Sequence, residues 1–558
     1  MRRAAAGSVI PLTLLLLFFT GYVLYPLAVM VGESLAAPDG VSFHRYAEVL
    51  NPANRGNVEA AVNSVMVSIL SVVGGGLVGV GLAFTVTQLR FPLRRVIALL
   101  AVVPVALPPL VGVIAFLFVF GESGILPRLL QAAFGIPASR LALDGLSAIV
   151  AVHVYSFNTY FFLFASAALR RIDASQLEAA AGLGASPFRI FRLIVLPELR
   201  PALAGASVLT FMASMASFSA PLLFAGSHRF ITLQIYTTKL NGDLPLAATQ
   251  SLLLSLVAFG FFLLLYAGGG SRITLRRTRG AERAGVLAVG APVRALLVGG
   301  SFLVIILEAL PLAVILMVSF AREGSWTWQI LPESFTVANY TRLLGERQVF
   351  EPILNSLLMA AVALAAVLLV GVTAAYLVTK GALRRRRGLW DALLTLPYAI
   401  PGTVLAIALI LSFNRPVPVT GFRVLVGTFW ILPLAYLLRT YPLMIRSASA
   451  ALDQLDDGLL EAAASLGAGP WLRFRTVILP LILPAVVGGG VLTLITVLGE
   501  FVSSILLYTF STRPIAVEIL AQLRAYNFGS AAAYCVLLMT LILLVVGIGN
   551  RLSRPSSD

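Results

Sequence analysis

The side chains that most often perform catalysis or bind metal ions are sparse and scattered in this sequence of 558 residues. His44, His153 and His228 are the three histidines, and Cys535 is the single cysteine. They show neither the ligand spacing of a zinc site nor the cysteine pairs of a disulfide framework. The sequence shows neither a cluster of histidines and carboxylates nor the spacing of a catalytic nucleophile and its base. We therefore expect no catalytic residues and no metal site in this chain.

One carboxylate lies where a charge is costly, inside a long apolar segment. It belongs to Glu500, which precedes Phe501, and the matching segment of the first half contains Ser217, Phe218 and Ser219. An ionisable group at membrane depth is often retained because it lines a cavity or a transport path. The alternative is that Glu500 bonds to a neighbouring helix near the membrane surface. These five residues are our candidates for a transport path.

Two pairs of prolines are also candidates for that path. Pro104 and Pro108 share one apolar segment, and Pro397 and Pro401 share another with the same spacing. Proline removes a backbone hydrogen bond and disturbs the preceding turn, so each pair is expected to break its helix. A broken helix suits a gate, although prolines are also common in membrane helices.

Three further polar residues lie in apolar segments. Glu308 and Arg439 are expected either to pair or to extend their charged ends to the membrane surface. His153 is expected to be a hydrogen-bonded core residue rather than a ligand.

The composition indicates an all-α integral membrane protein. Hydrophobic residues make up 59% of the chain and charged residues 11%, whereas soluble domains average about 45–50% and about 25%. Apolar segments of 18 or more residues can each cross a bilayer as a helix. Twelve spans are predicted, the first of them uncleaved, near residues 9–31, 62–89, 96–120, 145–169, 201–225, 246–268, 295–319, 353–379, 389–413, 424–445, 483–508 and 529–550.

The net charge of +16 comes mainly from arginines in short loops between the apolar segments. This is the positive-inside pattern of membrane proteins, and it argues against nucleic-acid binding. It predicts a multi-pass membrane protein with both termini in the cytoplasm. The basic segment 271–294 is expected to be a cytoplasmic linker between a first repeat, 1–270, and a second, 295–558.

The two halves repeat the same landmarks in the same order, which predicts two parallel six-helix repeats. Asn63-Ser64 is matched by Asn355-Ser356, and Val208-Leu209-Thr210 by Val491-Leu492-Thr493. The proline pairs match as well, and so do the segments that begin at Arg229 and Arg513.

The most specific match is a motif between the fourth and fifth spans of each half. The first copy consists of Glu178, Ala179, Ala180, Gly184, Ile194, Leu196 and Pro197. The second copy, at identical spacing, consists of Glu461, Ala462, Ala463, Gly467, Val477, Leu479 and Pro480. Alanines favour a short helix, and the glycine allows the chain to leave it in a left-handed conformation. Such a helix on the cytoplasmic face suits insertion into a groove of a partner.

The motif resembles the EAA loop of permease subunits in bacterial binding-protein-dependent ABC importers, which implies location in a bacterial plasma (inner) membrane. The fused twelve-span order resembles the ferric-iron type permeases, with thiamine and phosphonate permeases as related alternatives. The resemblance implies the type I importer fold, in which each motif helix couples to one of two ATPase subunits. It also implies that Glu178 and Glu461 meet basic residues there. The sequence has no GxxxxGK[ST] motif, so ATP and Mg²⁺ are expected to bind to the partner subunits.

The resemblance further implies that an extracytoplasmic binding protein docks near Arg229 and Arg513. Two rival functions stay open. An ion-gradient-driven transporter would need a cluster of ionisable residues at the membrane midplane, and the sequence shows only scattered ones. A membrane-embedded enzyme would need a catalytic constellation, and none is evident.

Overall fold

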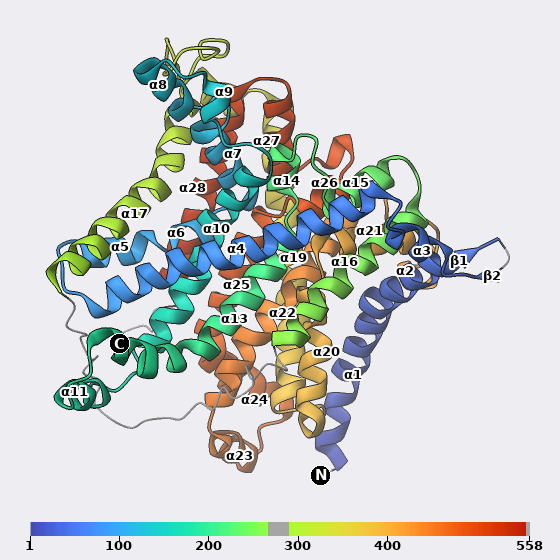
Figure 1. The fold of residues 1–558 in the computed structure, drawn as a ribbon. Helices are drawn as coiled ribbons and strands as arrows, with labels where there is room; N and C mark the ends of the chain where they lie inside the picture. The colour runs from blue at the N-terminus through green and yellow to red at the C-terminus, as the bar shows by residue number, and fades with distance from the viewer. Residues whose placement is uncertain (1, 39, 266–289, 554–558) are drawn as a thin grey trace. The chain divides into compact units, whose positions relative to one another are not determined.

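The computed structural model describes residues 2–38, 40–265 and 290–553, so most of the predicted linker 271–294 lies outside the described residues. Helices are the main secondary structure within these ranges, and the two strands form a short antiparallel pair, β1 (Ala36–Ala37) and β2 (Gly40–Val41). The long helices of the first half are α1 (Arg2–Phe19), α2 (Tyr25–Leu35), α4 (Arg55–Gln88), α7 (Pro109–Phe120), α10 (Gly145–Leu169), α13 (Leu196–Met215) and α16 (Leu244–Leu265) (Figure 1).

The long helices of the second half follow in a similar order. They are α17 (Ala291–Ser319), α19 (Arg347–Thr379), α20 (Arg387–Ala399), α21 (Gly402–Phe413), α22 (Ile431–Gln454), α25 (Leu479–Leu498) and α28 (Phe528–Leu552).

Short helices connect the long ones. In the first half these are α3 (His44–Leu50), α5 (Arg94–Leu100), α6 (Val103–Ala106), α8 (Ile125–Phe134), α9 (Ala138–Leu141), α11 (Ala174–Gly182), α12 (Pro187–Ile190), α14 (Ser219–Phe224) and α15 (Ile231–Leu240). In the second half they are α18 (Ala338–Gly345), α23 (Asp457–Ser465), α24 (Pro470–Arg473), α26 (Val502–Leu507) and α27 (Ile515–Arg524).

Ten helical segments in the described part of the chain are long and apolar enough to span a membrane, or eleven if a bent pair is one span. The sequence predicted twelve. The difference lies in α22, which carries Arg439, Arg446 and Asp453 and is not among these segments. The bent pair joins the helix ending at Ala399 to α21 at an angle of 95°.

The chain forms two compact units that do not follow its order. The first comprises residues 1–45, 235–252 and 337–558, and the second comprises 46–234 and 253–336. In the first unit α2 packs against α21, and the rings of Tyr25 and Phe413 lie 6.2 Å apart. In the second unit α17 packs against α4, α5 and α7. The first helix of each half is therefore part of the compact unit that holds most of the other half.

Equivalent glycines allow the central helices of each unit to approach closely. In the second unit α4 packs along α10, and a Cβ added at Gly79 would lie 2.2 Å from the carbonyl oxygen of Asn158. In the first unit α19 packs along α22, and a Cβ at Gly371 would lie 2.6 Å from that of Met444. Small residues at such crossings permit close backbone packing. The repeat read from the sequence is thus also a repeat of helix packing.

Candidate functional site

The two copies of the sequence motif form short helices, α11 and α23, which we call the motif helices (Figure 1). Each begins at an aspartate whose carboxylate caps the first turn. Asp173 accepts a hydrogen bond from the backbone N–H of Ser175 at 3.0 Å, and Asp456 accepts one from Gly458 at 2.9 Å. An N-terminal cap of this kind satisfies a donor that the helix leaves unpaired.

The predicted glycine follows the end of each motif helix by two residues. Gly184 and Gly467 have φ angles of +79° and +83°, in the left-handed region, so the predicted left-handed exit is confirmed. Open space surrounds both positions, which shows that backbone conformation rather than crowding favours glycine. The residues just before them, Leu183 and Leu466, are each 88% exposed.

The chain returns from each motif helix through one wide turn of π-helix, at Phe191–Val195 and at Phe474–Ile478. Each turn begins with a phenylalanine whose ring packs edge-on against an aromatic ring of α4 or α19. The centroids of Phe84 and Phe191 lie 6.0 Å apart, and those of Tyr376 and Phe474 lie 6.1 Å apart. The remaining motif residues lie in this turn or at the start of the following helix: Ile194, Leu196, Pro197, Val477, Leu479 and Pro480.

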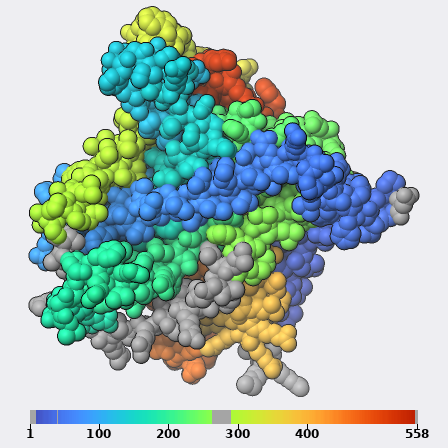
Figure 2. Space-filling view, viewed as in Figure 1, coloured from blue at the N-terminus to red at the C-terminus, as the bar shows by residue number. Residues whose placement is uncertain are grey.

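The outer surface of each motif helix combines an acid, small residues and large apolar groups. Glu178 and Glu461 are exposed, as are Ala179 and Ala462, whereas Ala180 and Ala463 are half-buried. Figure 2 shows the green segment that contains α11 at the molecular surface. Glu178 and Glu461 form none of the ion pairs found among the described residues. Their carboxylates are therefore free to meet a partner.

Sequence reasoning missed the apolar part of this surface. Besides Leu183 and Leu466, the equivalent aromatic residues Phe188 and Trp471 are 72% and 70% exposed. Exposed apolar clusters of this kind are typical of protein contact surfaces. Their signal in the sequence is the recurrence of a large apolar residue on both sides of the motif glycine in both halves.

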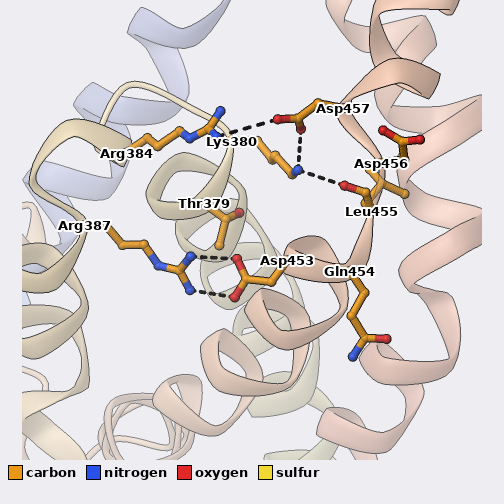
Figure 3. Close-up of a pocket in the computed structure, with 9 residues that line it drawn as sticks. All are labelled: Thr379, Lys380, Arg384, Arg387, Asp453, Gln454, Leu455, Asp456 and Asp457. Atoms are coloured by element: carbon orange, nitrogen blue, oxygen red, sulfur yellow. Dashed lines mark hydrogen bonds and ion pairs between the residues drawn. The ribbon is translucent and has the colours of Figure 1, made fainter. Parts of the chain in front are cut away.

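A cluster of ion pairs joins the loop between α19 and α20 to the start of α23, and the start of α20 to the end of α22 (Figure 3). Both nitrogens at the end of the Arg387 guanidinium donate to the Asp453 carboxylate, at 2.6 and 2.7 Å. Lys380 donates to Asp457 and also to the carbonyl oxygen of Leu455 at 3.0 Å. Arg384 lies 3.6 Å from Asp457. We call these five charged residues the ion-pair cluster.

The ion-pair cluster lines a hollow of about 630 Å³. The hydrogen bond and charge of Lys380 hold the pKa of the Asp457 carboxyl below its usual range, because both favour the ionised form. The cluster thus attaches the second motif helix to the adjacent loop by paired charges.

The first half lacks the charges needed for such a cluster. Gln88 takes the place of Lys380, Ala174 that of Asp457, and Arg170 that of Asp453. Arg94 corresponds to Arg387, and within the described part of the first half neither Arg94 nor Arg170 forms an ion pair. The two motif helices therefore share an outer surface but differ in their attachment.

The predicted path residues of the second half lie where a helix is interrupted. α25 ends at Leu498 and α26 begins at Val502, so Glu500 and Phe501 occupy the break between them. The Glu500 carboxylate is 2.7 Å from the Arg439 guanidinium and accepts a hydrogen bond from the backbone N–H of Ser503 at 2.9 Å. Glu500 is 6% exposed, and Arg439 is 26% exposed. Interrupted backbone at membrane depth is tolerated where it is buried in protein or lines a cavity.

The equivalent break of the first half uses neutral groups. α13 ends at Met215 and α14 begins at Ser219, so Ser217 and Phe218 lie between them. The hydroxyl group of Ser217 is 2.9 Å from Nε2 of His153, and Ser214 lies 3.0 Å from Nδ1 of the same ring. The prediction that His153 is a hydrogen-bonded core residue is confirmed.

The two remaining intramembrane charges do not pair with each other. Glu308 accepts a hydrogen bond from the side-chain amide of Asn158 at 2.9 Å, whereas Arg439 pairs with Glu500. The predicted pairing of Glu308 with Arg439 is therefore wrong, because each side chain has a different partner.

The proline pairs break both helices that contain them, as predicted. In the first half Pro104 lies in α6 and Pro108 directly precedes α7. In the second half Pro397 lies in α20 and Pro401 precedes α21, at the 95° bend. A Cβ added at Gly402, the first residue after this bend, would lie 3.1 Å from the Arg439 guanidinium. The bend is therefore adjacent to the Arg439–Glu500 pair.

The asparagine of each repeated Asn-Ser pair bonds to the backbone of the segment that begins at Arg229 or Arg513. The amide of Asn63 donates to the carbonyl oxygen of Arg229 at 3.1 Å, and that of Asn355 donates to the one of Arg513 at 3.2 Å. The Arg513 guanidinium lies 2.7 Å from the buried Glu518 carboxylate. Equivalent side chains thus fix equivalent loops in both units.

Comparison with protein families gives one match that covers both halves. The model described as "Binding-protein-dependent transport system inner membrane component" matches residues 75–270 and 367–556. Together these ranges cover more than half of the chain.

Three curated proteins illustrate the similarity. The probable ABC transporter permease protein y4fN of Sinorhizobium fredii is 31% identical over 89% of this chain and 88% of its own length. The ferric transport system permease protein FbpB of Actinobacillus pleuropneumoniae is 26% identical over 97% of this chain and 77% of its own. The molybdenum transport system permease protein ModB of Mycobacterium bovis is 36% identical over 33% of this chain and 68% of its own.

Proposed function

This chain belongs to the inner membrane components of binding-protein-dependent transport systems, and on that premise we propose that it moves ferric iron into the cytoplasm. It is the multi-pass permease of an ABC importer and not itself the catalytic subunit. In the proposed mechanism, a binding protein delivers the solute and two separate ATPase subunits drive alternating access.

The observation that carries the mechanism is the matched outer surface of the two motif helices. Each presents a free carboxylate, a small-residue stretch and an exposed leucine and aromatic residue at equivalent positions. A surface built twice suits two copies of one partner, since each copy would meet the same groups. We assign α11 and α23 as the coupling helices, with Glu178 and Glu461 facing basic residues of the ATPase subunits. This places both motif helices and both termini in the cytoplasm.

A chain of contacts within the first compact unit suggests how the movement of α23 reaches the transport path. Within the ion-pair cluster, Lys380 and Arg384 attach Asp457 of α23 to the loop before α20. α20 continues through the 95° bend into α21, whose first residue lies beside Arg439. Arg439 in turn pairs with Glu500. A displacement of α23 would therefore shift the bend and alter the surroundings of that pair.

The transport-path candidates of this proposal lie at the helix break of each half. They are Glu500 and Phe501 in the second half and Ser217, Phe218 and Ser219 in the first, and Pro104, Pro108, Pro397 and Pro401 permit the bends of the neighbouring helices. The segments at Arg229 and Arg513 form the outer face where the binding protein docks. Because the Arg513 charge is already paired with Glu518, we expect its loop backbone to contribute more than its charge.

The choice of ferric iron rests on the fused architecture and on the similarity to FbpB over 97% of this chain. A strain that lacks the permease should lose accumulation of radioactive ferric iron, and the wild-type gene should restore it. Normal iron uptake with loss of thiamine, phosphonate or molybdate uptake would contradict the choice of ferric iron and identify that solute as the substrate.

A second experiment separates the ABC mechanism from an ion-gradient-driven transporter. The permease, ATPase subunits and binding protein are reconstituted in liposomes without an ion gradient, and uptake is measured with and without ATP. Uptake that depends on ATP supports the proposal. Uptake driven by a proton or sodium gradient without ATP would contradict it.

A further inference from the structure

The loop between α4 and α5 in the first half forms a hollow of about 450 Å³, lined by Arg90, Phe91, Leu93, Arg94 and Arg95. We call it the basic hollow. It directly follows Gln88, the last residue of a 34-residue helix that is a candidate membrane span. It corresponds to the loop that holds Lys380, Arg384 and Arg387 in the second half.

The three guanidinium groups of the basic hollow have no acidic partner in the described part of the chain. Arg90, Arg94 and Arg95 are exposed and occur in none of the ion pairs. Arg94 donates only a long hydrogen bond, of 3.5 Å, to the backbone oxygen of Leu89. Arg294, at the start of α17, adds a further cation, since it donates to the backbone oxygen of Arg90.

Three cations of the corresponding loop in the second half have carboxylate partners within the chain. Asp453 and Asp457 supply carboxylates to Arg387, Arg384 and Lys380. In the first half an arginine and an alanine stand in place of those aspartates. The same loop thus has an internal counter-ion in one half and none in the other.

Apolar groups complete the basic hollow. The ring of Phe91 packs against Phe302 of α17 with centroids 6.2 Å apart. Leu93 is 61% exposed and has a φ angle of +61°, in the left-handed region. A non-glycine residue in that region is strained, and here the strained backbone presents an aliphatic side chain beside three unpaired cations.

We propose that the basic hollow binds the phosphate of an anionic phospholipid, with Leu93 against the upper acyl chain. Basic pockets next to membrane helices at the cytoplasmic surface suit anionic headgroups. A soluble anion would satisfy the guanidinium groups but would leave Leu93 in water. The lipid phosphate takes the place in the first half that the two aspartates occupy in the second. The cytoplasmic location of the basic hollow rests on the proposed function, but lipid binding itself does not require transport.

Lipid binding to the purified full-length permease can be measured by native mass spectrometry, with phosphatidylglycerol and phosphatidylcholine as probes. Wild type should retain phosphatidylglycerol in preference to phosphatidylcholine. The double variant Arg94→Ala/Arg95→Ala should lose at least about tenfold in affinity for phosphatidylglycerol, since each cation near a membrane surface contributes about fivefold. The matched control Arg385→Ala/Arg386→Ala removes two arginines from the equivalent loop and should change affinity less than about twofold.

A second variant keeps the proposal testable if the double variant does not fold. Leu93→Asp places a carboxylate among the three guanidinium groups, and aspartate tolerates the left-handed conformation better than leucine. It should abolish the preference for phosphatidylglycerol while the protein elutes as wild type. Equal losses in the control variant would show diffuse attraction and overturn the proposal. Displacement of the lipid by millimolar inorganic phosphate would also overturn it, in favour of a soluble anion.

Discussion

The two motif helices share an outer surface and differ in their attachment to the rest of the protein. On both, an exposed glutamate, an exposed leucine and an exposed aromatic residue recur at the same positions. Behind them, two ion pairs join Asp457 of α23 to the neighbouring loop and a third joins α20 to the end of α22, whereas the equivalent positions near α11 are basic or neutral. Features that recur in both halves are those that two copies of one partner would require. The features that differ can serve only one half, so they affect how movement is transmitted rather than whether the partner binds.

The largest effect should follow from reversing either shared glutamate. Glu178→Lys or Glu461→Lys turns an attraction to a basic surface into a repulsion, and losing a partly buried charge contact should cost about 2–5 kcal/mol of association. Solute uptake in reconstituted liposomes should fall at least about tenfold. The control Gln176→Lys adds a positive charge to α11 but keeps Glu178, and uptake should change little. If the control and Glu178→Lys lose the same activity, net charge rather than the glutamate is responsible.

A smaller but still symmetrical effect is expected from the exposed aromatic residues. Phe188→Ala or Trp471→Ala should weaken ATPase binding by more than about 1 kcal/mol, as truncation of a buried interface anchor does. Because both side chains are exposed in the permease alone, its thermal unfolding temperature should not change. ATPase affinity measured by surface plasmon resonance tests this. Unchanged affinity in both variants would remove these residues from the interface.

An asymmetric effect is expected from the ion-pair cluster. In the variant Arg387→Asp, the new carboxylate should repel Asp453. Uptake should fall by about 1.5–5-fold, since exposed ion pairs contribute about 0.2–1 kcal/mol. The charge swap Arg387→Asp/Asp453→Arg should restore most of the loss. The equivalent change in the first half, Arg94→Asp, breaks no ion pair, so it should not cause this loss of uptake. Failure of the charge swap to restore uptake would argue against the pairing.

The smallest effect concerns pH. Lys380 lowers the pKa of Asp457, so the pair contributes stability above the ordinary aspartate pKa of about 3.9 and loses it as pH falls through the lowered value. Between pH 5 and 8 the cluster should therefore stay intact. Proteolysis at the junction of α22 and α23 should proceed at a constant rate over this range, after correction for protease activity. A step between pH 5 and 8 would show that a different group controls the junction.

Much of the architecture was predictable because it depends on local pattern. Apolar length predicted most spans, the proline pairs predicted the two helix breaks, and the glycine of each motif predicted a left-handed helix end. These features are determined within a few residues of the chain. The predicted tenth span, 424–445, differs for a similar local reason, since α22 carries charges that lower its apolar character.

The rest depends on contacts between distant segments, which one sequence does not reveal. The exchange of the first helix between the compact units joins α2 to α21 and α17 to α7. The Arg439–Glu500 pair joins α22 to the break between α25 and α26, and the sequence showed its two charges only separately. In the ion-pair cluster, Arg387 at the start of α20 bonds to Asp453 near the end of α22, 66 residues away. The coupling role itself stays a prediction, because only a partner can test it.

The measurement that tests the central claim most directly is co-purification of the ATPase with the permease. The affinity-tagged variant Glu178→Lys/Glu461→Lys is isolated from membranes together with its ATPase subunits, beside wild type and the control Gln176→Lys. Wild type and the control should retain the ATPase, and the double variant should lose it while it remains folded in the membrane. Retention of the ATPase by the double variant, with wild-type transport, would contradict the assignment of α11 and α23 as coupling helices.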